Sequence, residues 1–403
     1  MRKHKKSFCI IAALCLSVAY LSQCTSNTKQ PDDPRGRAYA GAASCRQCHQ
    51  AIYDSIVKTA HFSATAAASK ENIQGNFTAG QNSFIYNDSE KVVMETRDSG
   101  LYQALYINGR EKEAHRFDIT FGSRHAQTWL YWQDDNTYEL PVSYYNAVHD
   151  WATSPGFSST VPNFKRFIGG DCFECHSSNM TSRLNASTAG IAEVMVKNSI
   201  IYGIDCERCH GPAAQHVYFH QQNPDIKTAN YIVTGNSLSQ QQKLDRCAVC
   251  HSGNAKVKLE SRFKFRPGDT LTNFLMDKLD DVKTNDIDVH GNQYKLMSKS
   301  QCFLASKKMD CATCHDPHRD ANESLAFYSQ KCLGCHSEVT HNFCPKAASI
   351  GPSIKNNCID CHMPEKPSAA ISFKMAGDTQ NSSYLLRTHL IAVYLAEKEK
   401  KPR

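Results

Sequence analysis

No stretch of this sequence is long and apolar enough to form a membrane-spanning helix. The longest apolar run, residues 8–21, falls short of the roughly 18 residues that a span needs. Apolar residues make up 41% of the chain, and the mean hydropathy is −0.50. These values exclude a bundle of membrane helices, and a length of 403 residues favours two or three globular domains.

A strong positive charge is also missing from most of the chain. The formal charge of +7 includes four basic residues and no acidic residue within residues 1–23. Without that segment the formal charge is only +3. A nucleic-acid partner therefore loses its electrostatic support, and none is predicted.

The N-terminus has the pattern of an export signal, in which a basic start precedes the apolar run. No A-x-A cleavage site follows; instead residues 21–24 (LSQC) resemble a bacterial lipobox. We therefore predict a signal peptide over 1–23, lipidation of Cys24 and a polar tether over 24–40. The alternative is an ordinary secretory signal in which Cys24 has no role. In both cases the chain is exported, either to the periplasmic face of a membrane or as an outer-membrane or cell-surface lipoprotein, and thiols can oxidise there.

Cysteine and histidine are abundant, with 19 and 18 residues, and most of them fall into one repeated pattern. Cys-x-x-Cys-His, the attachment pattern of c-type haem, occurs seven times. Each cysteine can form a thioether with one porphyrin vinyl group, and the adjacent histidine can ligate the iron. The predicted cofactors are therefore seven covalently attached haem c groups, at motifs numbered 1 to 7 in chain order. The predicted thioether residues are Cys45, Cys48, Cys172, Cys175, Cys206, Cys209, Cys247, Cys250, Cys311, Cys314, Cys332, Cys335, Cys358 and Cys361. The predicted proximal ligands are His49, His176, His210, His251, His315, His336 and His362.

Structural zinc and disulfides explain this pattern less well. Zinc sites need two converging cysteine pairs and do not need a histidine after every second cysteine. Disulfides alone would leave seven histidines in register unexplained. Of the cysteines outside the motifs, Cys9 and Cys15 lie in the signal. Cys302 and Cys344 remain, as either one disulfide or two buried thiols.

Haem attachment would make the protein acidic. Each ferric haem with two histidine ligands adds one negative charge, so seven of them lower the formal charge to about −4, and full reduction lowers it to about −11. A basic redox protein is therefore the predicted partner, and a membrane quinol-oxidising complex is one candidate.

Between motifs 1 and 2 lies a long stretch without a haem motif. Residues 91–96 and 101–107 are rich in β-branched and aromatic residues, and Asn108-Gly109 predicts a hairpin into residues 114–121. Two more candidate strands cover 129–132 and 137–142. We predict a β-rich antiparallel insert over about residues 80–145.

The predicted fold class is a multihaem cytochrome c, made mainly of short helices and loops wrapped around a haem core. The heptahaem domain is expected over 41–395, including the insert, and a charged tail over 396–403. Apolar spacing predicts a helix over 51–60, and residues 239–242 resemble a capping box that opens a helix ending in motif 4. The irregular spacing of the motifs argues against a solenoid.

The supply of histidine permits a second axial ligand at every iron. Ten histidines remain outside the motifs and the signal, so full bis-histidine ligation is predicted. In order of strength, the candidate distal ligands are His318, His216, His61, His290, His389 and His125, with His149 or His341 as the seventh. The other two, His115 and His220, are expected to be surface or hydrogen-bonded histidines.

Longer phrases around the motifs resemble one known family. They are ELPVSYYNAVHDWATSPGF (139–157), YGIDCERCHGP (202–212), SQCFLASKKMDCATCHDPHR (300–319) and CIDCHMP (358–364). The chain resembles the multihaem c-type cytochromes of the superfamily that includes the nitrifier tetrahaem electron carrier and the haem nitrite and hydroxylamine enzymes, and especially a bacterial branch often fused to tetratricopeptide repeats. The resemblance implies that His318 and His216 ligate haems of other motifs, and it favours the Cys302–Cys344 disulfide.

Two function classes follow. The first is an electron-transfer protein with a chain of bis-histidine haems, and the lack of any Cys-x-x-Cys-Lys motif, which catalytic relatives often carry, favours it. The alternative is a reductase or oxidase of a small nitrogen or sulfur oxyanion at one five-coordinate haem. In that case Arg124, Tyr144, Tyr145 and Trp151 would line a pocket; otherwise they are packing residues of the insert.

Overall fold

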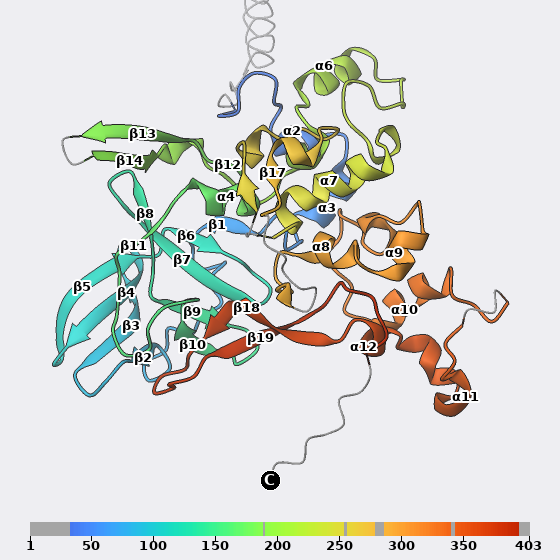
Figure 1. Cartoon of the computed structure of the whole chain (residues 1–403). Helices are drawn as coiled ribbons and strands as arrows, with labels where there is room; N and C mark the ends of the chain where they lie inside the picture. Colours follow the sequence, from blue (N-terminus) through green and yellow to red (C-terminus); the bar gives the residue numbers. More distant parts are fainter. Residues whose placement is uncertain (1–32, 188–189, 254–255, 279–285, 340–342, 395–403) are drawn as a thin grey trace, which may run out of the picture.

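A computed structural model describes residues 33–187, 190–253, 256–278, 286–339 and 343–394. The predicted signal, Cys24, His341 and the charged tail lie outside these residues. Figure 1 shows two regions: a β-rich part and a part made of short helices and loops. Within the described ranges, no helix is long and apolar enough to cross a membrane.

The first sheet of the β-rich part is a four-stranded antiparallel meander. It consists of β2 (Ser83–Ile85), β3 (Glu90–Arg97), β4 (Gly100–Ile107) and β5 (Arg110–Arg116), paired in that order. The turn from β4 to β5 places Asn108 at φ 50° and Gly109 at φ 76°. Two successive positive φ angles match the twist of a two-residue hairpin, so the predicted hairpin at this position is confirmed.

The second sheet has seven strands, with the order β1-β6-β7-β8-β11 and with β9 joining β7 to β10. Its strands are β1 (Thr65–Ala67), β6 (Ile119–Phe121), β7 (Ala126–Gln133), β8 (Asn136–Glu139), β9 (Val142–Tyr145), β10 (Asp150–Thr153) and β11 (Arg166–Ile168).

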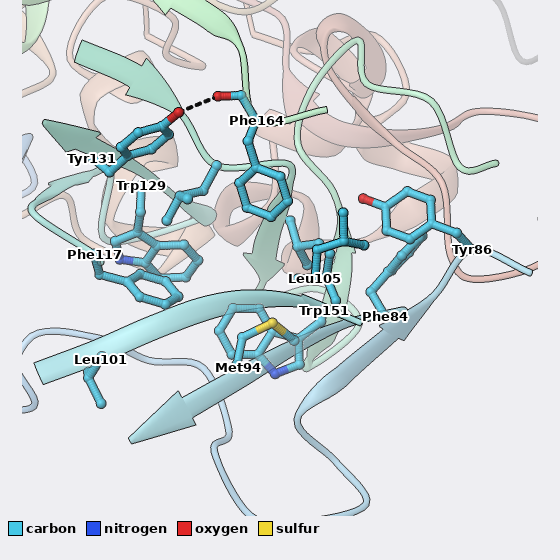
Figure 2. Packing of buried hydrophobic residues seen from close by; sticks show 13 residues of the cluster. Phe84, Tyr86, Met94, Leu101, Leu105, Phe117, Trp129, Tyr131, Trp151 and Phe164 are labelled. Carbon is cyan, nitrogen blue, oxygen red and sulfur yellow. Dashed lines mark hydrogen bonds between the residues drawn. The ribbon is translucent and has the colours of Figure 1, made fainter. Parts of the chain in front are cut away.

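An apolar core joins the two sheets (Figure 2). Val92 and Met94 on β3 face it, while the residues between them on the strand are less buried. From the second sheet, Trp129 and Trp151 pack against each other with ring centroids 5.4 Å apart. The Tyr131 hydroxyl donates a hydrogen bond of 2.6 Å to the carbonyl oxygen of Phe164, which satisfies the polar end of a buried ring.

The β-rich insert is present, but it is larger than predicted and two of its strands are divided. Strands run from Thr65 to Ile168 rather than over 80–145. The predicted strand 114–121 is interrupted at Asp118, whose carboxylate accepts a 2.7 Å hydrogen bond from the Trp132 amide. The predicted strand 137–142 breaks near Pro141, because proline has no N–H for a sheet ladder.

Buried Glu139 at the end of β8 makes the stability of this region dependent on pH. Burial raises the pKa of its carboxyl to about 7, although Arg166, with Nε 3.3 Å away, opposes the rise. Because the unfolded chain ionises near pH 4.5, the folded state loses stability as pH rises from that value to about 7. Glu139→Gln cannot ionise, so we expect it to gain on the order of 3 kcal/mol relative to the wild type across this interval.

Thermal unfolding at pH 5 and pH 7.5 tests this expectation. Glu323→Gln, at a fully solvated side chain, is the control and should follow the wild type. If the difference between Glu139→Gln and the wild type is the same at both pH values, the carboxyl ionises normally and the expectation is wrong.

The helices of the second part are short. They are α2 (Ala42–Arg46), α3 (Gln50–Ile56), α4 (Gly170–His176), α5 (Cys206–His210), α6 (Ala214–Gln222), α7 (Gln240–His251), α8 (Gln293–Met297), α9 (Gln301–Ala305), α10 (Leu325–Leu333), α11 (Ala347–Ile350) and α12 (Ile359–His362). The predicted capping box is confirmed: the Ser239 hydroxyl accepts from the Gln242 amide at 3.3 Å, and the Gln242 side chain accepts from the Ser239 amide at 3.0 Å.

This part also contains β structure that was not predicted. Two hairpins stand out in Figure 1: β13 (Ser182–Ser187) with β14 (Gly190–Met195), and β18 (Glu365–Phe373) with β19 (Ser382–Arg387). The others are the short pairs β12 (Ser177–Asn179) with β15 (Ile201–Tyr202), and β16 (Val257–Lys258) with β17 (Leu275–Met276). These segments were expected to be helices and loops, and the structure forms strands there.

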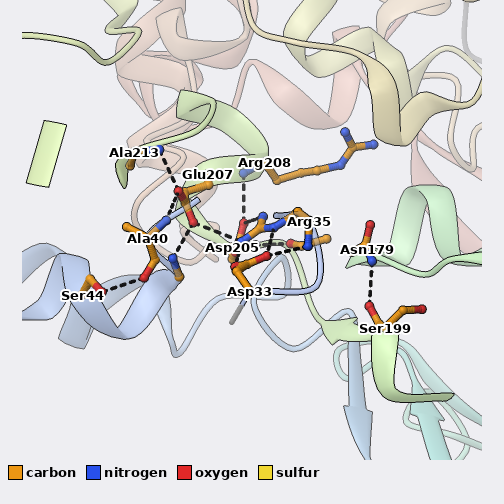
Figure 3. Close-up of polar contacts among 12 residues, drawn as sticks. Asp33, Arg35, Ala40, Ser44, Asn179, Ser199, Asp205, Glu207, Arg208 and Ala213 are labelled. Atoms are coloured by element: carbon orange, nitrogen blue, oxygen red, sulfur yellow. Dashed lines mark hydrogen bonds and ion pairs between the residues drawn. The ribbon is translucent and has the colours of Figure 1, made fainter. Parts of the chain in front are cut away.

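Residues 33–41, hereafter the strap, are held against α5 by a buried ionic cluster (Figure 3). The Arg35 guanidinium lies 2.9 Å from Asp33, 2.8 Å from Asp205 and 3.1 Å from Glu207. Burial alone would lower the pKa of Arg35, but hydrogen bonds to Asp33 and the charge of Asp205 raise it above its ordinary value. Residues 33–40 were predicted to belong to a free tether, and this cluster shows that they do not.

Candidate haem-binding sites

Each Cys-x-x-Cys-His motif forms one turn of helix. Motifs 2, 3 and 4 are the ends or the whole of α4, α5 and α7. In the other four motifs the histidine amide donates to the carbonyl of the first cysteine, at 2.8 to 3.1 Å. One helical turn brings both thiols and the imidazole to the same side of the backbone, which is the arrangement that one porphyrin edge and its iron require.

The motifs lie against one another in a sequence that differs from chain order. Motif 1 contacts motif 3, where a thiol–thiol hydrogen bond lowers the pKa of Cys45 and raises that of Cys206. The same type of contact joins motif 2 to motif 4, where it lowers the pKa of Cys250 to about 6 and raises that of Cys175. A third contact joins motif 4 to motif 5 through Cys247 and Cys311. Motif 4 therefore contacts two other motifs, 2 and 5.

Four motif histidines face a histidine from elsewhere in the chain. The distances between ring centroids are 6.3 Å for His49–His216, 5.8 Å for His210–His318, 5.9 Å for His251–His61 and 6.3 Å for His315–His389. With metal–nitrogen bonds of about 2 Å, two imidazoles on opposite sides of one metal ion have centroids about 6 Å apart. All four pairs therefore fit an iron between the rings.

Hydrogen bonds fix several of these imidazoles in the form that a metal needs. Nδ1 lies 2.8 Å from the Val233 carbonyl in His210 and 2.7 Å from the Asn230 carbonyl in His216. His362 of motif 7 makes the same bond to a carbonyl at 2.9 Å. Because a carbonyl only accepts, Nδ1 must carry the proton, and the lone pair of Nε2 is left for the metal.

Burial keeps other members of the set neutral. It lowers the pKa of His176 and His389 to about 4, and a neighbouring histidine adds to the effect in each case. These imidazoles are therefore uncharged at neutral pH, as ligands must be. For His176 of motif 2 the neighbour with the largest charge effect is His290, which is itself buried and whose Nδ1 has no hydrogen-bond partner.

Two cavities lie beside the His210–His318 pair. One, of about 530 Å³, is lined by Ala51, Ile52, Ser55, Asp316, His318 and Arg319. The other, of about 440 Å³, includes His210, Tyr231 and Arg266 in its lining. Each cavity combines an imidazole, apolar surface and an arginine, and this donor set suits an iron porphyrin with anionic propionates.

Other predicted distal ligands are not placed beside a motif histidine. His125 lies 3.0 Å from the Tyr384 hydroxyl, and exposed His149 occupies a turn at φ 50°. His115, which was expected to be a surface or hydrogen-bonded histidine and not a ligand, packs on Tyr131 inside the β-rich part. Between described residues, the ring contacts of His362 include no histidine.

The predicted disulfide is not formed in the structure. Cys302 and Cys344 are both free thiols, and no disulfide joins any described cysteines. Burial and the charge of Cys335 raise the pKa of Cys302, which places this thiol beside motif 6. The pairing with Cys344 therefore stays a prediction, without support from the geometry.

The four residues that would line an oxyanion pocket do not form one. Trp151 lies in the core between the sheets, and Tyr145 lies in a separate cluster with Phe373. Arg124 is turned toward Asp320, with Nη1 3.2 Å from its carboxylate. Tyr144 packs against the inter-sheet core, so packing explains the aromatic members of this set.

Comparisons with known proteins agree with the haem motifs. Residues 147–211 match the family described as cytochrome c554 and c-prime. A segment of 202 residues is 25% identical to the dissimilatory sulfite reductase MccA of Wolinella succinogenes and covers 48% of this chain but only 23% of that protein. In fold, the chain is similar to an outer cell wall cytochrome, OcwA, with a TM-score of 0.52 and 14% identity, over 88% of this chain and 80% of that one. Together with the motifs, these findings support a multihaem c-type cytochrome with covalently bound haem.

Proposed function

We propose that this protein is an exported heptahaem cytochrome c that passes electrons through a chain of haems, each held by two histidines. The haems, when bound, would supply one-electron redox chemistry. The polypeptide would hold each iron between two imidazoles, fix the donor nitrogens and exclude water and substrates from the sixth position.

One observation carries the proposal: motif histidines face histidines of distant segments at the spacing of two axial ligands. It supports His216, His318, His61 and His389 as distal ligands of motifs 1, 3, 4 and 5. At motif 2, the electrostatic effect of His290 on His176 favours the same role for His290.

The contacts among motifs support a continuous path. Thiol contacts connect motif 1 to 3, 2 to 4 and 4 to 5. The charge of Cys247 acts on Cys209, which brings motif 3 close to motif 4. The charges of Cys358 and Cys314 act on Cys332, which brings motifs 5, 6 and 7 together. The proposed path therefore runs 1-3-4-5-6-7, with motif 2 as a branch at motif 4.

The proposal also includes the place in the cell where the protein acts. The basic and apolar N-terminus supports export, and Cys24 supports a lipid anchor at a membrane face. The acidic charge expected of the holoprotein supports a basic redox protein or a membrane quinol-oxidising complex as the partner.

Low-temperature electron paramagnetic resonance of the purified ferric protein tests the function. We expect seven haems per chain by haem and protein assay, with low-spin signals throughout and no change on adding cyanide, nitrite or sulfite. The ring planes of three pairs are 12°, 14° and 27° apart, whereas His61 and His251 are 81° apart. Near-parallel imidazoles give rhombic low-spin signals, and crossed imidazoles give a strongly anisotropic one, so both types should be present.

A second candidate function is the reduction of a small sulfur or nitrogen oxyanion at one five-coordinate haem. The 25% identity to a sulfite reductase favours it. Motif 7 is the candidate position of the five-coordinate haem, because no histidine among the described residues packs against the ring of His362. A high-spin ferric signal that sulfite or nitrite removes would support this function and overturn the pure electron carrier.

A further inference from the structure

The chain leaves the strap at a defined place on the surface. Buried Arg35 fixes the strap to α5, and the Ala214 amide at the start of α6 donates a 3.0 Å hydrogen bond to the Ala38 carbonyl. The eight residues between Cys24 and Asp33 can span at most roughly 30 Å. A lipid on Cys24 would therefore hold this end of the molecule close to the membrane.

Next to the strap lies a lobe, residues 213–236, that is unusually poor in charge. It contains only Asp225 and Lys227 as charged residues, whereas charged residues make up 21% of the whole chain. Its exposed side chains are mostly uncharged, and they include three large apolar or aromatic ones: Tyr218 is 66% exposed, Tyr231 55% and Ile226 40%.

Helix α6 gives the lobe an inner and an outer side. His216 and His220 lie one turn apart, their rings are 4.6 Å apart, and His216 faces His49 of motif 1. Tyr218, two residues from each of them, points to the opposite side of the helix. The outer side of α6 therefore presents Tyr218, while the inner side serves motif 1.

We propose that the outer side of the lobe rests on the lipid bilayer to which the N-terminus is anchored. Tyrosine is enriched at membrane–water interfaces, since its ring is apolar and its hydroxyl stays hydrated. The near absence of charge removes the desolvation penalty that a charged face would meet there. In Figure 1 the strap and α6 lie at the same end of the molecule, so anchor and lobe can meet one surface.

The inference rests on the proposed function, because it assumes the exported, lipid-anchored form. It adds that the haem at motif 1 is the one presented to the membrane, as the entry or exit point for a membrane-bound redox partner. Motif 7, at the end of the proposed path, would face away from the bilayer.

Photolabelling tests the contact. The full-length holoprotein is reconstituted into vesicles of phosphatidylethanolamine and phosphatidylglycerol that contain a diazirine-bearing phospholipid, irradiated and mapped by mass spectrometry. We expect labels within 213–236 at several-fold higher yield than in β2 or β19, which lie toward the other end of the molecule. Labels mainly on β2 or β19, or labels spread evenly over the surface, would overturn the proposal.

Matched variants separate the lobe from general surface effects. Tyr218→Ser should lower the labelling of the lobe several-fold, whereas Tyr218→Phe should preserve it. Ile85→Ser with Leu385→Ser, at positions that are both 54% exposed, is the control and should change nothing. Each variant is first checked for full haem content and low-spin spectra.

Two further outcomes would count against the proposal. A holoprotein with normal low-spin spectra that does not attach to vesicles would overturn the membrane contact and leave electron transfer standing. Labelling of the lobe by a membrane protein rather than by lipid, in vesicles that contain native membrane protein, would assign this face to a protein partner and overturn the lipid contact.

Discussion

Replacing His216 by alanine is expected to turn one haem in seven from low-spin to high-spin. The His216 ring lies 6.3 Å from that of His49 with only 12° between their planes, and its Nδ1 is tied to the Asn230 carbonyl. If His216 is the second histidine ligand at motif 1, as proposed, removing its side chain would leave the haem iron there with one protein ligand. A ferric high-spin signal and carbon monoxide binding by the reduced protein, each amounting to one haem per chain, should appear together.

His149→Ala is the matched control for this substitution. His149 is an exposed turn residue that contacts no motif histidine, so its removal should leave the low-spin spectrum of all haems unchanged. If His216→Ala stays fully low-spin while retaining all its haem, another residue ligates the iron at motif 1. In that event the axial pairing proposed from ring distances is wrong at this motif.

Among single substitutions in the strap, Arg35→Ala is expected to lower the free energy of unfolding most. The variant leaves Asp205 and Glu207 buried without their common cation, and breaking a buried ion pair in this way costs about 3–5 kcal/mol. The midpoint of guanidinium-induced unfolding should fall clearly. The strap should also detach, because the ring of Tyr39 loses the guanidinium that stacks 4.2 Å above it.

Chymotrypsin, which cuts after aromatic residues, provides a direct test of detachment. Cleavage after Tyr39 should be slow in the wild type and fast in Arg35→Ala. Arg37→Ala removes an exposed arginine two residues away and should behave like the wild type in both assays. Equal cleavage of all three proteins would mean that the ionic cluster does not hold the strap.

Local sequence patterns predicted the features whose chemistry is local. The thioether cysteines and proximal histidines follow from a five-residue spacing, and the start of α7 follows from Ser239 and Gln242. The Asn108-Gly109 turn belongs to the same class, because its geometry depends on two residues. His216, His318, His61 and His389 were named as ligand candidates, but only the fold shows which motif each of them faces.

Features that depend on tertiary contacts were missed. The strap contains one aspartate, one proline, two glycines and two arginines, which is the composition of a linker. Only its contacts with Asp205 and Glu207, far along the chain, show that it is held in place. In the hairpin β13–β14, the apolar residues Leu184 and Ile191 are exposed. The sequence therefore lacks the alternation of buried apolar and exposed polar residues from which a strand is predicted. The Cys302–Cys344 pairing was inferred from the two cysteines left over and was favoured by the family resemblance; both are free thiols in the structure, and the pairing stays a prediction.

The pairing of histidines across distant segments has a consequence for how the protein is made. His49 faces His216, and His315 faces His389 near the end of the described chain, so in both pairs the second histidine is synthesised long after the first. Haem attachment, which needs only the local five-residue motif, can therefore precede completion of the iron's ligand shell. Each iron would pass through a one-histidine state during biogenesis and become saturated only when the remote segment docks. The change of each iron from high-spin to low-spin would then show when its remote segment docks. The site that His389 completes would be among the last to change.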